Sequence, residues 1–82
     1  MITEAVNRAI LDVLYACGSY QLKEETLCIM VNMKLDALAV SSSELKEHLQ
    51  FCKGKDWIDY EFADMSQTRK WWIKPAGKVV RS

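Results

Sequence analysis

Apolar residues recur at helical spacing over the first part of the chain. Positions i, i+3, i+4, i+7, i+8 and i+11 are occupied by Val6, Ala9, Ile10, Val13, Leu14 and Cys17. This is the apolar stripe of a helix with 3.6 residues per turn, and it predicts a helix from about Thr3 to Cys17. Thr3 is a candidate N-cap, and Gly18 supplies the left-handed residue that commonly follows a helix.

A second helical pattern begins near Lys23, after a short connection in which Tyr20 is expected to form a one-bridge strand. Acids stand at Glu24 and Glu25, in the first turn, where the helix dipole favours carboxylates. The repeating apolar positions are Leu27, Met30, Val31 and Leu35, and Ile29 and Met33 widen the stripe. Such a broad apolar face predicts a helix that lies between two others or also meets a partner.

A run of serines opens a third helical pattern. Ser41 and Glu44 have the spacing of a capping box, and Gly54 is expected to end the helix. The inward stripe is Leu45, Leu49 and Cys52, flanked by His48 and Phe51. The side chains expected to point outward are Ser42, Ser43, Lys46, Glu47, Gln50 and Lys53. This polar face is a candidate recognition surface.

After the third helix, apolar and polar residues alternate with a period of two. Trp57 to Ala63 and Thr68 to Lys74 are predicted strands, joined by a polar turn at residues 64–67. Ile58, Tyr60 and Phe62 share one face of the first strand; in the second, Trp71 and Ile73 oppose Lys70, Trp72 and Lys74. Pro75 is expected to end the second strand and to begin a turn into a short basic tail.

This order of elements resembles winged helix-turn-helix DNA-binding domains, such as MarR-like and PadR-like transcription regulators and small phage regulators. The residues that carry the resemblance are Val40 to Leu45, His48-Leu49, Lys53 to Ile58 and Trp72 to Gly77. The resemblance implies an α+β winged helix-turn-helix with three helices and a C-terminal two- or three-stranded antiparallel wing. Residues 1–82 would form a single winged-helix domain.

The resemblance also implies a function. The family places its third helix in the major groove, so the helix Ser42–Lys53 would read double-stranded DNA while the hairpin contacts phosphate. The implied DNA-binding residues are Ser42, Ser43, Lys46, Gln50 and Lys53 on the helix and Ser66, Gln67, Arg69 and Lys70 on the hairpin. Gln can pair with adenine, Lys with guanine acceptors and Ser with bases or phosphate. The protein is therefore expected to be a small transcriptional regulator from a bacterium or its phage.

Charge is unevenly distributed along a chain whose net charge is zero. From Met65 to Ser82 there are five cations and no acids, and the first 64 residues carry a net charge of −5. This polarity is compatible with a basic edge for DNA, although a merely solvated C-terminal segment would show the same pattern. Because Glu44, Glu47 and Asp56 lie on or near the reading helix, a homodimer that doubles the contacts is the expected binder. Dimerisation is expected through the first helix or the C-terminal segment.

Other function classes have less support. The three cysteines form no CxxC pair and are expected to be free thiols in a reducing cytoplasm. His48 and Cys52 are four residues apart, but without a second ligand pair they predict no metal site, and no cofactor is expected. The serine run has no positioned base, and no enzyme activity is predicted. No segment is long and apolar enough to span a membrane.

The rival hypothesis is a winged-helix protein–protein interaction module that binds no nucleic acid, with Trp72 as a contact to its partner.

Overall fold

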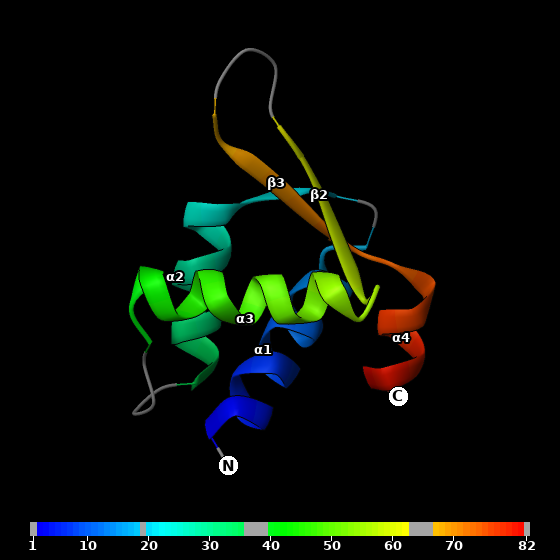
Figure 1. Cartoon of the computed structure of the whole chain (residues 1–82), viewed down its shortest axis with the longest axis horizontal. Coiled ribbons are helices and arrows are strands. Elements are labelled where there is room, and N and C mark those ends of the chain that lie inside the picture. Colours follow the sequence, from blue (N-terminus) through cyan, green and yellow to red (C-terminus); the bar gives the residue numbers. More distant parts are fainter. Residues whose placement is uncertain (1, 19, 36–39, 63–66, 82) are drawn as a thin grey trace.

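The computed structural model describes residues 2–18, 20–35, 40–62 and 67–81, which form four helices and three strands (Figure 1). In chain order the elements are α1 (Ile2–Ala16), β1 (Leu22–Lys23), α2 (Glu24–Leu35), α3 (Ser42–Gly54), β2 (Ile58–Phe62), β3 (Arg69–Ile73) and α4 (Pro75–Arg81). Helix α3 crosses α1 and α2, and the β2–β3 hairpin extends beyond the helices. The predicted α+β architecture is confirmed, with one more helix than the sequence indicated.

Helix α1 carries the predicted apolar stripe. Val6, Ile10 and Leu14 are fully buried, as the spacing requires for a helix packed on one face. Gly18 has a φ of 62° and ends the helix in the left-handed conformation, as predicted. The helix begins at Ile2, however, so Thr3 lies inside its first turn. The prediction of Thr3 as the N-cap is therefore wrong.

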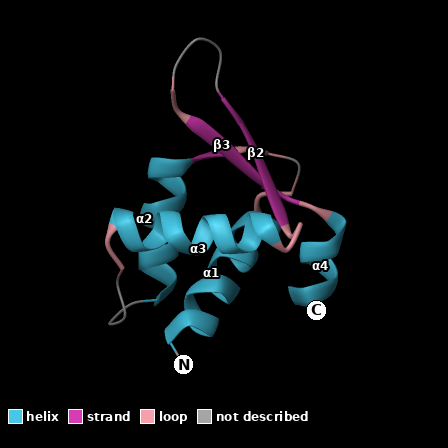
Figure 2. Cartoon of the chain, in the orientation of Figure 1, coloured by secondary structure: helices cyan, strands magenta, loops and turns pink. Residues whose placement is uncertain are grey.

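The sheet is antiparallel with strand order β1-β3-β2 (Figure 2). Trp71 of β3 lies opposite Tyr60 on one side and Leu22 on the other. The third strand thus comes from the connection between α1 and α2. It lies at Leu22–Lys23, two residues beyond the bridge predicted at Tyr20. Two residues suffice for this edge strand because Leu22 can pack its side chain against the core.

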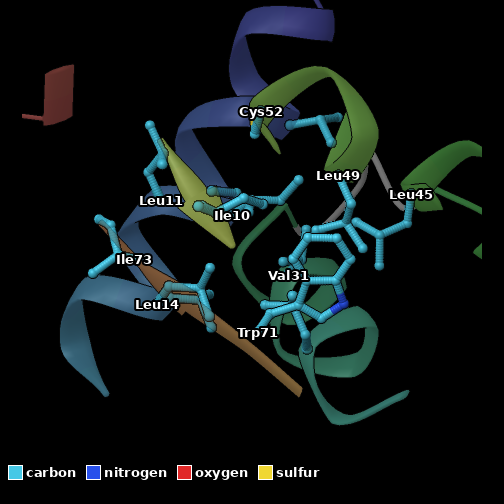
Figure 3. Packing of buried hydrophobic residues seen from close by; sticks show 14 of the residues in the cluster. Ile10, Leu11, Leu14, Val31, Leu45, Leu49, Cys52, Trp71 and Ile73 are labelled. Carbon is cyan, nitrogen blue, oxygen red and sulfur yellow. The ribbon is translucent and has the colours of Figure 1, made fainter. Parts of the chain in front are cut away.

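The core lies where α1, α2, α3 and the inner face of the sheet meet (Figure 3). Trp71 is the largest fully buried side chain of the core, to which α3 contributes Leu45, Leu49 and Cys52. Leu27 and Val31 are the fully buried residues of α2. Ile29 and Met33 are 58% and 77% exposed, so the apolar stripe of α2 continues onto its solvent side. The broad stripe therefore leaves an uncovered apolar face.

Helix α3 ends in a Schellman motif that uses aspartate in place of glycine. Gly54 is still helical, Lys55 is the C-cap, and Asp56 adopts a φ of 65°. The N–H of Trp57 donates to the carbonyl of Cys52 at 3.1 Å, and the N–H of Asp56 to that of Lys53 at 2.9 Å. The predicted end of the helix at Gly54 is confirmed, but the left-handed residue that closes it is Asp56, two positions later.

The basic tail predicted after Pro75 is the helix α4. Proline suits the first helical position because its fixed φ matches the helix and its missing N–H has no partner to lose there. Gly77 is buried, and a Cβ atom on it would lie 2.3 Å from the carbonyl oxygen of Trp57. Arg81 anchors the other end of the helix, with Nε 2.7 Å from Oδ1 of Asp12 and its guanidinium over the ring of Tyr15. The prediction of a turn at Pro75 is therefore wrong, because the helix begins there.

Candidate nucleic-acid interface

The outer face of α3 is polar and open to solvent. At its start, Ser41 Oγ accepts a hydrogen bond from the backbone N–H of Glu44 and donates one to its carboxylate, both at 3.2 Å, so the predicted cap is confirmed. The exposed residues that follow are Ser42, Ser43, Lys46, Glu47 and Gln50. Because Leu45 and Leu49 are buried on the opposite side, this face can approach a partner without disturbing the core.

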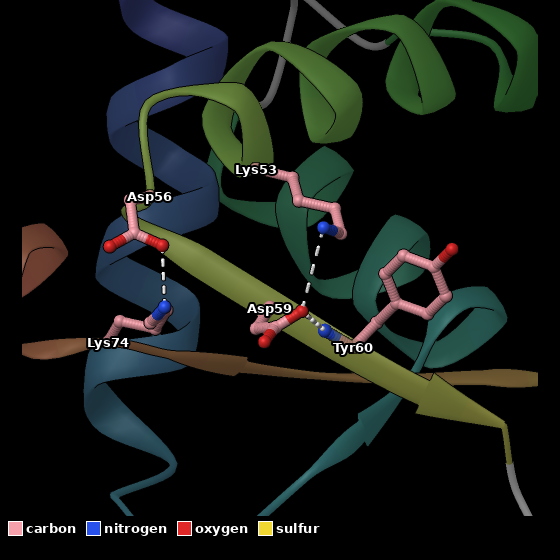
Figure 4. A network of polar contacts seen from close by, with 5 residues as sticks. All are labelled: Lys53, Asp56, Asp59, Tyr60 and Lys74. Carbon is pink, nitrogen blue, oxygen red and sulfur yellow. Dashed lines mark hydrogen bonds and ion pairs between the residues drawn. The ribbon is translucent and has the colours of Figure 1, made fainter.

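Lys53, at the end of the same face, is partly engaged within the chain (Figure 4). Its Nζ lies 3.8 Å from Oδ1 of Asp59 and 5.6 Å from the ring centre of Tyr60. Asp59 Oδ1 also accepts the backbone N–H of Tyr60 at 2.8 Å, which holds the carboxylate in place. The Lys53 and Asp59 side chains are 40% and 38% exposed, so water screens this pair strongly and it is weak.

The two hairpin cations expected to contact phosphate lie on opposite faces of β3. Successive side chains of a strand alternate, so Arg69 shares the face of buried Trp71, whereas Lys70 lies on the other face. Lys70 is opposite Glu61 in one neighbouring strand and Lys23 in the other. Gln67 is exposed, and Ser66 lies outside the described residues. The structure therefore separates two groups that sequence proximity placed together.

Arg69 contacts three residues that the sequence did not mark as part of a site. Its Nη1 lies 3.5 Å from Oε1 of Glu24, and its guanidinium is 5.1 Å and 5.9 Å from the ring centres of Tyr60 and Phe62. Strand alternation indicates that Tyr60 and Phe62 share a face. Glu24 is 45 positions from Arg69 in the chain, so only the tertiary structure reveals that pair.

Of the three acids on or near α3, Asp56 is paired with a cation. Asp56 Oδ1 accepts a hydrogen bond from Lys74 Nζ at 2.5 Å. This hydrogen bond, with the charge of Asp56, raises the pKa of Lys74. Asp56 therefore repels a polyanion less than the sequence suggests, whereas Glu44 and Glu47 remain on exposed parts of α3.

A groove of about 330 Å³ separates the first turns of α2 and α3. It is lined by Glu24, Glu25, Cys28, Ile29, Ser42, Leu45 and Lys46. Two carboxylates on the α2 side thus face a lysine on the α3 side. The groove adjoins the outer face of α3, so these carboxylates belong to the electrostatic surroundings of any ligand bound there.

His48 and Cys52 face a polar residue of α1. His48 Nδ1 is 3.0 Å from Oδ1 of Asn7, and the Cys52 thiol donates to the same oxygen at 3.8 Å. Burial raises the pKa of the Cys52 thiol to about 12, so it stays protonated at neutral pH and is a poor metal ligand. No group of three His, Cys, Asp or Glu within the described ranges is arranged to hold a metal ion.

Comparisons with known proteins address the architecture. No family model and no curated protein matches the chain. Among solved structures, the chain is similar to a MarR-family transcriptional regulator from Silicibacter pomeroyi, with a TM-score of 0.74 and 22% identity. The chain has the winged helix-turn-helix fold. The match covers 94% of this chain but 46% of the other protein, so the chain spans about half of that protein's length.

In this winged helix, α2 and α3 form the helix-turn-helix and the β2–β3 hairpin is the wing. The outer face of α3, the groove and the inner side of the wing are contiguous through Lys46, Glu24 and Arg69. None of the helices traced in the described ranges could cross a membrane by its length and apolarity.

Proposed function

We propose that this winged helix binds double-stranded DNA and acts as a small transcriptional regulator, with α3 in the major groove and the wing against the phosphate backbone. The observation that carries the proposal is the division of α3 into a buried apolar side and an exposed polar side. Lys46 and Gln50 are one turn apart on that exposed side. Lys can reach guanine acceptors and Gln can bind adenine through two hydrogen bonds. The function needs no catalytic residue and no cofactor.

The remaining contacts are assigned by position. Ser42 and Ser43, in the first turn of α3, are suited to phosphate because a helix N-terminus favours anions. Lys53, Ser66, Gln67, Arg69 and Lys70 would contact the backbone beside the groove. The cations proposed to contact DNA are Lys46, Lys53, Arg69 and Lys70. Of these four, only Lys53 and Arg69 form ion pairs within the described part of the chain. Lys46 and Lys70 are therefore the cations we expect to contribute most to affinity.

We further propose that the binding species is a homodimer. Helix α4 exposes Val79 and Val80, and the end of α1 exposes Tyr15, which suits the expectation of contacts through the first helix or the C-terminal segment. Two copies would double a modest number of phosphate contacts. Light scattering at high micromolar concentration tests this, since a purely 9.4 kDa species would contradict it. The free thiols of Cys17, Cys28 and Cys52 support a cytoplasmic location.

The DNA proposal is tested by titrating the protein with random duplex DNA at two salt concentrations. We expect Lys46→Ala, Gln50→Ala and the double variant Arg69→Ala/Lys70→Ala each to weaken binding. The lysine and arginine variants should also flatten the salt dependence, by about 0.9 in logarithmic slope for each phosphate that is no longer neutralised. Lys34→Ala is the matched control, because Lys34 faces α1 on another side of the molecule. Equal affinity and salt dependence in all variants would refute the proposal.

The second candidate is a protein-interaction module, and the exposed apolar face of α2 favours it. Ile29 borders the groove, and Met33 lies one turn further along the same helix. Trp72 is half-buried on the outer face of the wing, opposite Asp59, and stays a further candidate contact. Wild-type protein that shows no salt-dependent affinity for duplex DNA would favour this function over the first.

A further inference from the structure

One carboxylate oxygen joins the helix-turn-helix to the wing. Oε1 of Glu24, the first residue of α2, accepts a hydrogen bond from Nε1 of Trp71 at 3.1 Å. The same oxygen lies 3.5 Å from Nη1 of Arg69. The Glu24 side chain thus holds both an indole that is fully buried in the core and a cation of the wing.

Arg69 is held from two sides. Oε1 of Glu24 lies 3.5 Å from Nη1 of its guanidinium, and the rings of Tyr60 and Phe62 lie within cation–π distance of the same group. A DNA phosphate that approached the wing would have to compete with Glu24 for this cation. Because the Glu24 carboxylate and a phosphate are both attracted by the one positive charge of the guanidinium, the ion pair with Glu24 weakens binding of a phosphate to Arg69.

We propose that Glu24 is an affinity-setting residue, which competes with DNA phosphate for Arg69 and thereby lowers the affinity of the winged helix for DNA. The inference rests on the proposed DNA-binding function and assigns to this site a residue that opposes the ligand. It also bears on the charge distribution, because Arg69, one of the five cations from Met65 to Ser82, is already paired with an acid of the first 64 residues.

The Glu24–Arg69 pair is better suited to this role than the Lys53–Asp59 pair. Glu24 and Arg69 side chains are 19% and 32% exposed, which is less than for Lys53 and Asp59. Water therefore screens the charge of Glu24 less, and its competition with a phosphate is stronger. The bond from Trp71 also prevents the Glu24 carboxylate from simply swinging away when DNA approaches.

The substitution Glu24→Gln separates competition from positioning. The amide oxygen of glutamine can still accept from Trp71 Nε1, so the wing keeps its attachment, but the negative charge that holds Arg69 is gone. We expect binding to random duplex DNA to strengthen by roughly two- to fivefold, the range of a partly exposed ion pair. The logarithmic salt slope should become steeper by about 0.9, because one more phosphate is neutralised.

Glu25→Gln is the matched control. Glu25 is exposed in the same helical turn and lines the same groove, so its removal changes the overall charge equally without releasing Arg69. The second control repeats both substitutions in an Arg69→Ala background. In that background Glu24→Gln should raise the affinity for DNA no more than Glu25→Gln does, because only the general loss of one negative charge remains.

The outcomes are distinct. The proposal is supported if Glu24→Gln, and not Glu25→Gln, raises the affinity for DNA and steepens the salt slope, and if both effects require Arg69. Equal effects of the two glutamine variants, or a gain that survives in Arg69→Ala, overturn it while leaving DNA binding intact. A loss of affinity together with a shift in tryptophan emission would mean that Glu24 positions the wing, which also overturns it. Wild type and variants that all fail to bind DNA would refute the proposed function itself.

Discussion

The side-chain amide of Asn32 satisfies both backbone hydrogen-bonding groups of Val40. Asn32 Oδ1 accepts from the Val40 N–H at 2.8 Å, and Asn32 Nδ2 donates to the Val40 carbonyl at 3.1 Å. Asn32 lies in the last part of α2, and Val40 immediately precedes the Ser41 cap of α3. One side chain therefore ties the end of α2 to the start of α3.

Replacing Asn32 with leucine should destabilise the fold. The leucine side chain has a similar shape but leaves the partly buried N–H and carbonyl of Val40 unpaired, which costs about 1–3 kcal/mol. Urea unfolding followed by circular dichroism measures the change. Met33→Ala is the neighbouring control and should change the free energy of unfolding by no more than about 0.5 kcal/mol, since Met33 is largely exposed. Equal stabilities of the two variants would contradict this role of Asn32.

The two helical glycines should respond oppositely to alanine. A Cβ on Gly77 would meet the Trp57 carbonyl oxygen, which already accepts the N–H of Lys74 at 2.8 Å. Gly77→Ala should therefore cost about 1–3 kcal/mol through overpacking. Gly54 has nothing within 4 Å of the added carbon, so Gly54→Ala should stabilise by up to about 1 kcal/mol. Thermal unfolding of both variants checks the sign of each change.

Asp56 combines an unfavourable backbone with a favourable charge. Its φ of 65° suits glycine better, while its carboxylate pairs with Lys74 at the surface. Asp56→Asn removes the ion pair with Lys74 but keeps a side chain that the left-handed conformation tolerates. Asp56→Gly removes the ion pair and also the steric cost of a Cβ atom in that conformation. We expect the glycine variant to be more stable than the asparagine variant, by up to about 1 kcal/mol. The reverse order in chemical unfolding would show that the backbone at Asp56 is not strained.

Burial of the Cys52 thiol should make stability depend on pH in the alkaline range. Its pKa is raised from 9.0 to about 12, so the folded state keeps a proton that the unfolded state loses. The stabilisation is complete below pH 9 and is lost as the pH rises towards 12, by up to about 4 kcal/mol. Unfolding measured from pH 8 to 11 should show a steeper decline in wild type than in Cys52→Ala. Cys17→Ala, which removes a less buried thiol, should decline like wild type.

Much of the fold was predictable because local periodicity reports which side of an element is buried. The stripe containing Leu45 and Leu49 and the alternation around Trp71 both placed the correct side chains in the core. Ends of elements were less predictable. Asp56, rather than Gly54, took the left-handed position because the hydrogen bonds of Trp57 and Asp56 close the helix there.

The candidate site was predictable on one of its two elements. The exposed polar face of α3 follows from helical spacing, since the outward residues are those between the buried leucines. The wing was harder, because strand alternation puts Arg69 and Lys70 on opposite faces but does not reveal that Glu24 pairs with Arg69. The assignment of individual DNA contacts stays a prediction.

The sequence by itself determined the order of the first three helices and of the β2–β3 hairpin and the face that each turns inward, because these depend on residues only a few positions apart. Only the tertiary structure decided which charges on the surface are already paired. Glu24 meets Arg69, and Lys53 meets Asp59, once the chain folds back on itself. Electrostatic interaction depends on distance through space, and the pattern along the chain carries no measure of that distance.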